Sequence, residues 1–89
     1  GEAACPGFIV ARLAPGDRGR VLPVGSNNVR SEPSTGATRV GVIPVGGEFA
    51  VLAGPECADG YAWWQVDYDG IVGWTAEGEG ETYWLEPLN

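Results

Sequence analysis

Apolar and polar residues alternate on both sides of an Asp-Gly pair at positions 69 and 70. Asp-Gly between two alternating runs is a strong local signal for a β-hairpin, because both turn positions adopt positive φ. Counting outward from this turn pairs Tyr68 with Ile71 and Gln65 with Trp74. Side chains alternate along a strand, so this register divides the hairpin into two faces. The predicted core face carries Trp64, Val66, Tyr68, Ile71, Gly73 and Thr75.

The opposite face of the hairpin is the first candidate for a binding surface. Its two indoles, Trp63 and Trp74, are diagonal neighbours in the predicted register, and Gln65 and Asp67 lie on the same face. Rigid aromatic rings supply contact area at a low cost in side-chain entropy. We therefore expect these four residues to contact a ligand.

The rest of the chain has a pattern typical of short strands separated by turns. Residues 1–24 form a proline- and glycine-punctuated arm with two short apolar runs. The predicted extended segments are residues 28–30, 39–43, 49–53 and 84–88, and the last is an edge strand because it contains Pro87. The predicted turns and irregular segments are residues 31–36, 44–47, 54–60 and 76–81.

The composition limits the chain to one small domain. It has 89 residues, with fifteen glycines and seven prolines, and no apolar run has the period and length of an ordinary helix. The sequence therefore predicts an all-β fold. A domain of this size buries only about 60% of the surface of its unfolded chain, so we expect a covalent cross-link to support the core.

Cys5 and Cys57 are the candidates for this cross-link. A four-ligand zinc site would need more ligands, and the chain has no His and only these two cysteines. A disulfide between them would stabilise the fold by roughly 4 kcal/mol in the chain-entropy model. The alternative is two buried free thiols. Because cytosolic thiols are kept reduced, a disulfide would place the protein outside the cell or in the cell envelope.

The charge excludes two classes of partner. Twelve carboxylates face five arginines, and the net charge is −7. Nucleic acids and anionic membranes both attract basic surfaces, so we expect no nucleic-acid partner. No run approaches the roughly eighteen apolar residues of a membrane span, so we expect no membrane insertion.

Several motifs together resemble the bacterial SH3-like (SH3b) domain family. They are NVRSEPS at residues 28–34, VIPVG at 42–46, VL at 51–52, WWQV at 63–66, DG at 69–70 and GW at 73–74. The resemblance covers roughly residues 27–75, with residues 84–88 as the closing strand. It implies a small, partly open five-stranded barrel, formed by residues 25–89, with the arm of residues 1–24 packed on it or strapped across it. Its long first loop would be residues 31–38, and its distal hairpin turn would be at residues 69–70.

The resemblance also implies a function. Such domains are mostly non-catalytic modules of secreted or cell-wall proteins, which bind peptidoglycan, its peptides or a protein partner. It places Trp63 in the ligand groove, with Trp74 beside it. The alternative is an interdomain spacer whose aromatic face is covered by Phe8, Ile9, Val10 or Leu13 of the arm. The charge of −7 favours this alternative, because bacterial walls are themselves largely anionic.

The remaining candidate residues point to no catalysis and no cofactor. Without His or Lys, a general base would have to be a carboxylate of raised pKa, and Asp67 and Asp69 flank an exposed turn. The alternating Glu77, Glu79 and Glu81 favour a solvated acidic loop over a calcium site, because they do not converge. Tyr83, next to Trp84, is either a further ligand contact or part of the barrel closure. For Arg30, a local salt bridge or loop hydrogen bond is weighed against contact with a ligand carboxylate.

Overall fold

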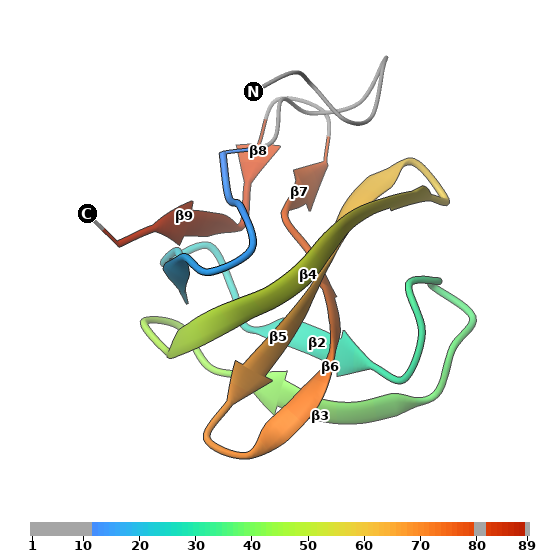
Figure 1. The fold of residues 1–89 in the computed structure, drawn as a ribbon, viewed down its shortest axis with the longest axis horizontal. Coiled ribbons are helices and arrows are strands. Elements are labelled where there is room, and N and C mark those ends of the chain that lie inside the picture. The colour runs from blue at the N-terminus through green and yellow to red at the C-terminus, as the bar shows by residue number, and fades with distance from the viewer. Residues whose placement is uncertain (1–11, 80–81, 89) are drawn as a thin grey trace.

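The computed structural model describes residues 12–79 and 82–88, which form a curled antiparallel β-sheet (Figure 1). Among these residues there is no helix and the main sheet is antiparallel, so the predicted all-β fold is confirmed. The strands are β1 (Arg18–Val21), β2 (Asn27–Arg30), β3 (Arg39–Ile43), β4 (Glu48–Ala58), β5 (Tyr61–Tyr68), β6 (Ile71–Ala76), β7 (Gly78–Glu79), β8 (Thr82–Tyr83) and β9 (Leu85–Pro87). Seven of them form one sheet in the order β3-β2-β6-β5-β4-β1-β9, and β7 pairs with β8.

The hairpin of β5 and β6 has the predicted register. Tyr68 pairs with Ile71 and Gln65 with Trp74, without a shift along the whole ladder. Asp69 and Gly70 form the turn with φ of 50° and 91°. The predicted core face is therefore confirmed: Trp64, Val66 and Thr75 are buried, while Tyr68 and Ile71 pack against the core.

The hairpin of β4 and β5 corrects the prediction of a loop at residues 54–60. β4 continues to Ala58, and a second Asp-Gly pair, Asp59 and Gly60, makes the turn with φ of 54° and 85°. Two register shifts interrupt the ladder, one between Val51 and Ala53 and one between Ala53 and Glu56. The second shift contains the Gly-Pro sequence at residues 54–55. Such a sequence favours a loop, but here it lies within a continuous strand.

The N-terminal segment contributes a strand to the main sheet. β1, which consists of residues 18–21 of the predicted arm, lies between β4 and β9. The amide of Val21 also donates to the carbonyl of Gly47, and Val21 accepts from the amide of Gly46. These bonds join β1 to the turn between β3 and β4. β3 itself is the strand at the other edge of the sheet. Nine strands are described against the expected five, and three of the four additional strands are β1, which joins the sheet, and the added pair of β7 and β8.

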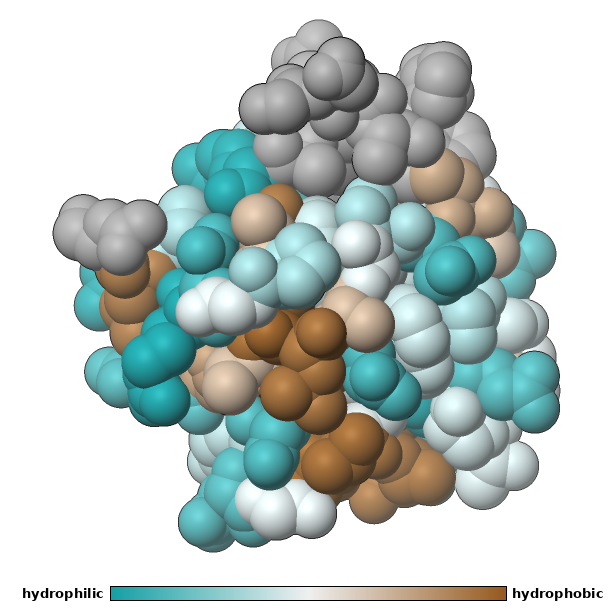
Figure 2. Space-filling view, viewed as in Figure 1, coloured by the Kyte–Doolittle hydropathy of each residue, from teal (hydrophilic) through white to brown (hydrophobic). Residues whose placement is uncertain are grey.

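One hydrophobic core lies inside the curl of the sheet. It consists of Leu13, Val21, Val29, Ile43, Phe49, Val51, Trp64, Val66 and Leu85. β4, the long strand that crosses the front of Figure 1, contributes Phe49 and Val51 to this core. In the view of Figure 2, apolar residues gather near the middle and the lower edge of the surface, with polar residues around them.

Candidate functional site

A pocket of about 390 Å³ lies apart from the core cluster, since none of the core residues lines it. Its walls come from the connection between β1 and β2, from β2, from the loop after β2, and from the ends of β5 and β6. We call it the aromatic pocket, after three of its lining residues. The residues that line it include Asn28, Arg30, Thr35, Tyr61, Trp63 and Trp84.

Trp63 lines the pocket but is held tightly. The register places it on the predicted outer face, where it pairs with Ala76. Its indole is nevertheless only 3% exposed, and its Nε1 donates a 2.9 Å hydrogen bond to the carbonyl of Ala58. The ring of Tyr61 meets it edge-on, with centroids 5.8 Å apart. Trp63 therefore acts as a fixed part of the pocket wall and presents little surface of its own.

Tyr61 and Trp84 supply the more accessible rings, and neither is among the residues expected at the site from sequence. Both are half-buried, and their centroids lie 5.7 Å apart at an interplanar angle of 39°. The Tyr61 hydroxyl donates to Oε2 of Glu79 at 3.4 Å. Burial, together with the negative charge of Glu79, raises the pKa of Tyr61 above its usual value. A local signal for Tyr61 existed, because it directly follows an Asp-Gly turn and lies two residues before Trp63, on the same face.

The loop of residues 31–38 forms one rim of the pocket and is fastened to the β4–β5 turn. The amide and hydroxyl of Thr35 both donate to Oδ2 of Asp59, at 3.0 and 3.2 Å. The backbone hydrogen bond from Thr35 lowers the pKa of Asp59, since it stabilises the carboxylate. The rim of the pocket is thus tied to the turn that positions Tyr61.

β2 provides the polar wall. Asn27 is buried and donates through Nδ2 to Oγ1 of Thr75 and to the carbonyl of Ala76, which fixes β2 against β6. Asn28 is exposed beside it. Nη1 of Arg30 donates a 2.9 Å hydrogen bond to the carbonyl of Ala37 in the rim loop. Of the two interpretations of Arg30 from sequence, the loop hydrogen bond is therefore observed.

Four of the residues expected at the site lie outside the pocket lining. Gln65 and Trp74 are cross-strand partners nearer the middle of the β5–β6 hairpin. Asp67 accepts a 3.0 Å hydrogen bond from the amide of Gly70 and so caps the distal turn. Tyr83 lies on β8, where the guanidinium of Arg12 stacks 3.6 Å from its ring centroid. The structure thus brings only Trp63 of the expected set into the aromatic pocket.

Glu77 corrects the expectation of a solvated acidic loop. Its side chain is fully buried between β6 and β7. Oε1 accepts from Nε1 of Trp64 at 2.7 Å, and Oε2 accepts from the amide of Arg12 at 2.8 Å. Burial raises the pKa of Glu77, and these two hydrogen bonds partly oppose that shift. The prediction of a solvated loop was wrong for Glu77 because it rested on the local Gly-Glu repeat. The long-range hydrogen bonds from Trp64 and Arg12 cannot be seen in that repeat.

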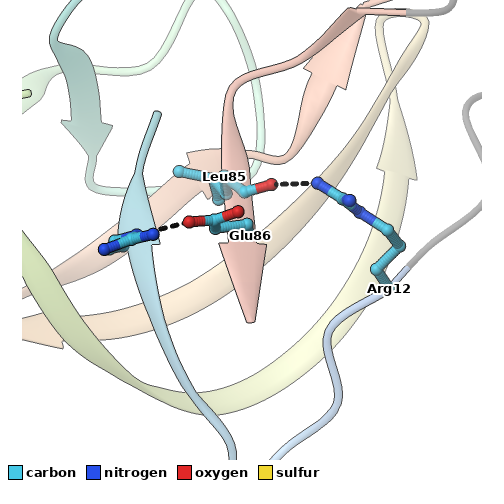
Figure 3. Close-up of polar contacts among 4 residues, drawn as sticks. Arg12, Leu85 and Glu86 are labelled. Carbon is cyan, nitrogen blue, oxygen red and sulfur yellow. Dashed lines mark hydrogen bonds and ion pairs between the residues drawn. The ribbon is translucent and has the colours of Figure 1, made fainter. Parts of the chain in front are cut away.

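Arg12 and the closing strand form a polar junction around this carboxylate. Nη2 of Arg12 donates to the carbonyl of Leu85 at 2.9 Å, and Arg20 forms an ion pair with Glu86 on the neighbouring strand (Figure 3). The amides of Trp84 and Leu85 both donate to the carbonyl of Glu77. The junction therefore holds the backbone of Trp84, one of the pocket residues, against the end of β6.

Two expectations concern residues 1–11. Cys5 lies outside the described residues, so its disulfide with Cys57, an exposed residue of β4, stays a prediction. Phe8, Ile9 and Val10 also lie outside them. Leu13 is described, and it packs in the core cluster that contains Trp64.

The comparisons with known proteins give one match. A family model described as "Bacterial SH3 domain" matches residues 23–81. No curated protein and no solved structure matches the chain. In the described part of the chain, no helix is long and apolar enough to cross a membrane, and no group of three or more His, Cys, Asp and Glu is arranged to hold a metal ion.

Proposed function

The chain belongs to the bacterial SH3 domain family, and we propose that it is a non-catalytic module that binds a cell-wall peptide or peptidoglycan in the aromatic pocket. The observation that carries this proposal is that Tyr61, Trp63, Trp84 and Arg30 line one cavity. Concave sites lined by aromatic rings with a few fixed polar groups are the usual form of a binding site. The family indicates a binding module in general, and the pocket supplies the particular surface.

The pocket also indicates how such a ligand would be held. A peptide or a sugar ring can lie on the half-buried faces of Tyr61 and Trp84, while the exposed amide of Asn28 offers hydrogen bonds. The wall is rigid, because Trp63 and Asn27 are both buried and hydrogen-bonded. Preorganised contacts of this kind reduce the entropy lost on binding.

A non-catalytic role agrees with the placement of the carboxylates. Glu77 is the carboxylate whose pKa is raised, but both its oxygens accept hydrogen bonds from the protein and it is not among the residues that line the pocket. Asp59 has a lowered pKa and is engaged with Thr35. Neither is poised to transfer a proton to a bound ligand near neutral pH.

We further propose that the protein is exported and that Cys57 pairs with Cys5. This proposal is supported by the small size of the domain, which favours a cross-link. Titration of thiols in denaturant without a reducing agent should find no free thiol per chain. Two free thiols would remove both the cross-link and its argument for export.

The binding proposal is tested by retention of the protein on purified peptidoglycan. Trp84→Ala removes one accessible ring of the pocket, and Trp74→Ala is the matched control, because it removes a half-buried indole outside the pocket. We expect Trp84→Ala to lower retention on the order of tenfold, since loss of an aromatic anchor commonly costs that much, and Trp74→Ala to retain binding. Unchanged melting temperatures would show that both variants are folded.

Other results would exclude the aromatic pocket. Loss of retention in Trp74→Ala with normal binding by Trp84→Ala would move the site to the face around Gln65 and Trp74. Absence of retention of the unmodified domain would contradict wall binding and favour the interdomain spacer.

A further inference from the structure

Among the described residues, no carboxylate pairs with Arg30, in contrast to Arg18 and Arg20. Arg18 pairs with Glu48 and Arg20 with Glu86, while the amide of Arg12 binds the carboxylate of Glu77. Within residues 12–79 and 82–88, Arg30 forms no ion pair, and its one hydrogen bond is from Nη1 to the carbonyl of Ala37.

A second arginine strengthens the positive charge at this place. Arg39 on β3 is the direct cross-strand partner of Arg30, and it too forms no ion pair among the described residues. Like charges directly opposite each other on two strands are destabilising. The pair therefore places two positive charges on neighbouring strands, and neither forms an ion pair with a described carboxylate, although the chain as a whole is acidic.

The geometry of Arg30 suits an anion from solution. A guanidinium carries five N–H donors in a planar fork, and Arg30 uses Nη1 to fix its orientation against the rim loop. Nε and Nη2 form no hydrogen bond to the described residues and belong to a side chain that lines the pocket. A carboxylate is the common bidentate partner of such a fork.

The pocket is also electrically polarised. The Tyr61 hydroxyl donates to Glu79 at 3.4 Å, and Asp59 lies in the turn directly before Tyr61, so two carboxylates lie at the Tyr61 end. The Arg30 end is positive. An anionic group is therefore repelled from the Tyr61 end and attracted to Arg30, which gives a bound ligand one orientation.

We infer that the ligand of the aromatic pocket is a peptide with a free carboxylate, which Arg30 binds while the rest of the peptide lies on Tyr61 and Trp84. This inference rests on the proposed function, and it names the chemical group that the pocket selects. It also reconciles an acidic domain with an anionic wall, because recognition depends on a local cation and not on the net charge.

The test compares two forms of one ligand by isothermal titration calorimetry. The probes are a peptidoglycan stem peptide with free carboxylates and the same peptide with its carboxylates converted to carboxamides. We expect the amidated peptide to bind the unmodified domain on the order of tenfold more weakly or worse, because the charge-assisted hydrogen bonds are lost. This arm needs no mutation and so does not depend on the folding of a variant.

Variants then assign the effect to one arginine. Arg30→Gln should weaken binding of the acid form on the order of tenfold or more, and Arg30→Lys should give an intermediate loss, because it keeps the charge without the fork. Arg39→Gln is the matched control: it removes the same charge next to Arg30 but outside the pocket lining, and it should weaken binding no more than about fivefold. Equal binding of acid and amide, or an equal loss in the Arg30→Gln and Arg39→Gln variants, would overturn the inference.

A third probe separates this inference from the proposed function. N-acetylglycine carries a carboxylate and no wall chemistry, and its binding is followed by the NMR signal of the Arg30 Nε–H. If neither form of the stem peptide binds, the proposed function fails. A saturable shift with N-acetylglycine would then still support an anion site at Arg30, whereas no shift would overturn it.

Discussion

The two Asp-Gly hairpins of this domain share strand β5 and have the same turn, but they differ in everything beyond the turn. Asp59-Gly60 and Asp69-Gly70 both have two successive residues at positive φ. The β5–β6 ladder is regular, whereas the β4–β5 ladder shifts register twice. The distal turn is capped locally by Asp67, while Asp59 reaches across the fold to Thr35. Local sequence thus sets the turn, and long-range contacts make only one of the two hairpins part of a pocket.

The largest effect is expected at the bend of β4. Gly54 has φ of 122°, and a Cβ there would lie 2.9 Å from the carbonyl oxygen of Trp63 and from the ring of Trp64. Gly54→Ala should therefore lower the free energy of unfolding by about 3 kcal/mol, because it adds both backbone strain and overlap in a packed region. Denaturant unfolding measures this value. A loss no greater than that of a turn glycine would show that the bend is not sterically required.

The turn glycines provide the matched pair for the comparison. Gly60 and Gly70 have positive φ, and a Cβ at either position would meet nothing within 4 Å. Gly60→Ala and Gly70→Ala should each cost about 1 kcal/mol of stability, because only the left-handed conformation is penalised. Only Gly60→Ala should also weaken retention on peptidoglycan, since Tyr61 follows it. Equal effects on retention would contradict the assignment of the pocket to one hairpin.

The two tryptophans of β5 have different hydrogen-bond acceptors, and only the acceptor of Trp64 should make the stability depend on pH. Trp63 donates to a carbonyl, whereas Trp64 donates to the carboxylate of Glu77, whose pKa is raised above the usual 4.5 by burial. The folded state therefore binds this proton more tightly than the unfolded chain. As the pH falls from neutral toward 4.5, the contribution of Glu77 to stability should rise.

This prediction is checked by unfolding curves of the unmodified protein and Glu77→Gln between pH 7 and 4.5. The unmodified protein should gain stability relative to the variant over this range. Glu56→Gln, which alters an exposed carboxylate of β4, serves as the control and should run parallel to the unmodified protein. Parallel curves for Glu77→Gln would contradict a raised pKa at this buried position.

The smallest effect is expected at Asp59, which is exposed. Its pKa is lowered from the usual 3.8 by the hydrogen bonds from Thr35, so its stabilising contribution is complete above that pH and is lost as the pH falls through the lowered pKa. The amide signal of Thr35 in NMR spectra should follow this titration. Asp59→Asn should abolish the response and Asp69→Asn should leave it intact. A response that survives Asp59→Asn would exclude the link between rim and turn.

The same comparison shows what could be predicted from sequence. The register and core face of the distal hairpin followed from one turn and strict alternation, because nothing interrupts that ladder. The same reasoning at Asp59-Gly60 would have found the second turn and Tyr61. It would not have found the register shifts near Gly54, because they change which residues face each other without a clear local signal.

Long-range partners account for the remaining differences. The burial of Glu77 depends on Arg12, 65 positions away in the chain, and the position of β1 depends on pairing with β4 and β9. The grouping of Trp84 with Tyr61 likewise joins two ends of the domain. Patterns of neighbouring residues contain no information on such contacts. Of the residues expected at the site, only Trp63 therefore lines the aromatic pocket, and a role in ligand binding stays a prediction for all of them.

The most direct test of the central claim is an NMR titration with the stem peptide, followed through the indole Nε1–H signals of the four tryptophans. The claim is that the pocket beside the Asp59-Gly60 turn, and not the face of the distal hairpin, binds the ligand. We predict saturable shifts for Trp63, Trp84 and the Thr35 amide, with the Gly70 amide unchanged. Shifts confined to Trp74 and Gly70, or no shift at any tryptophan, would contradict it.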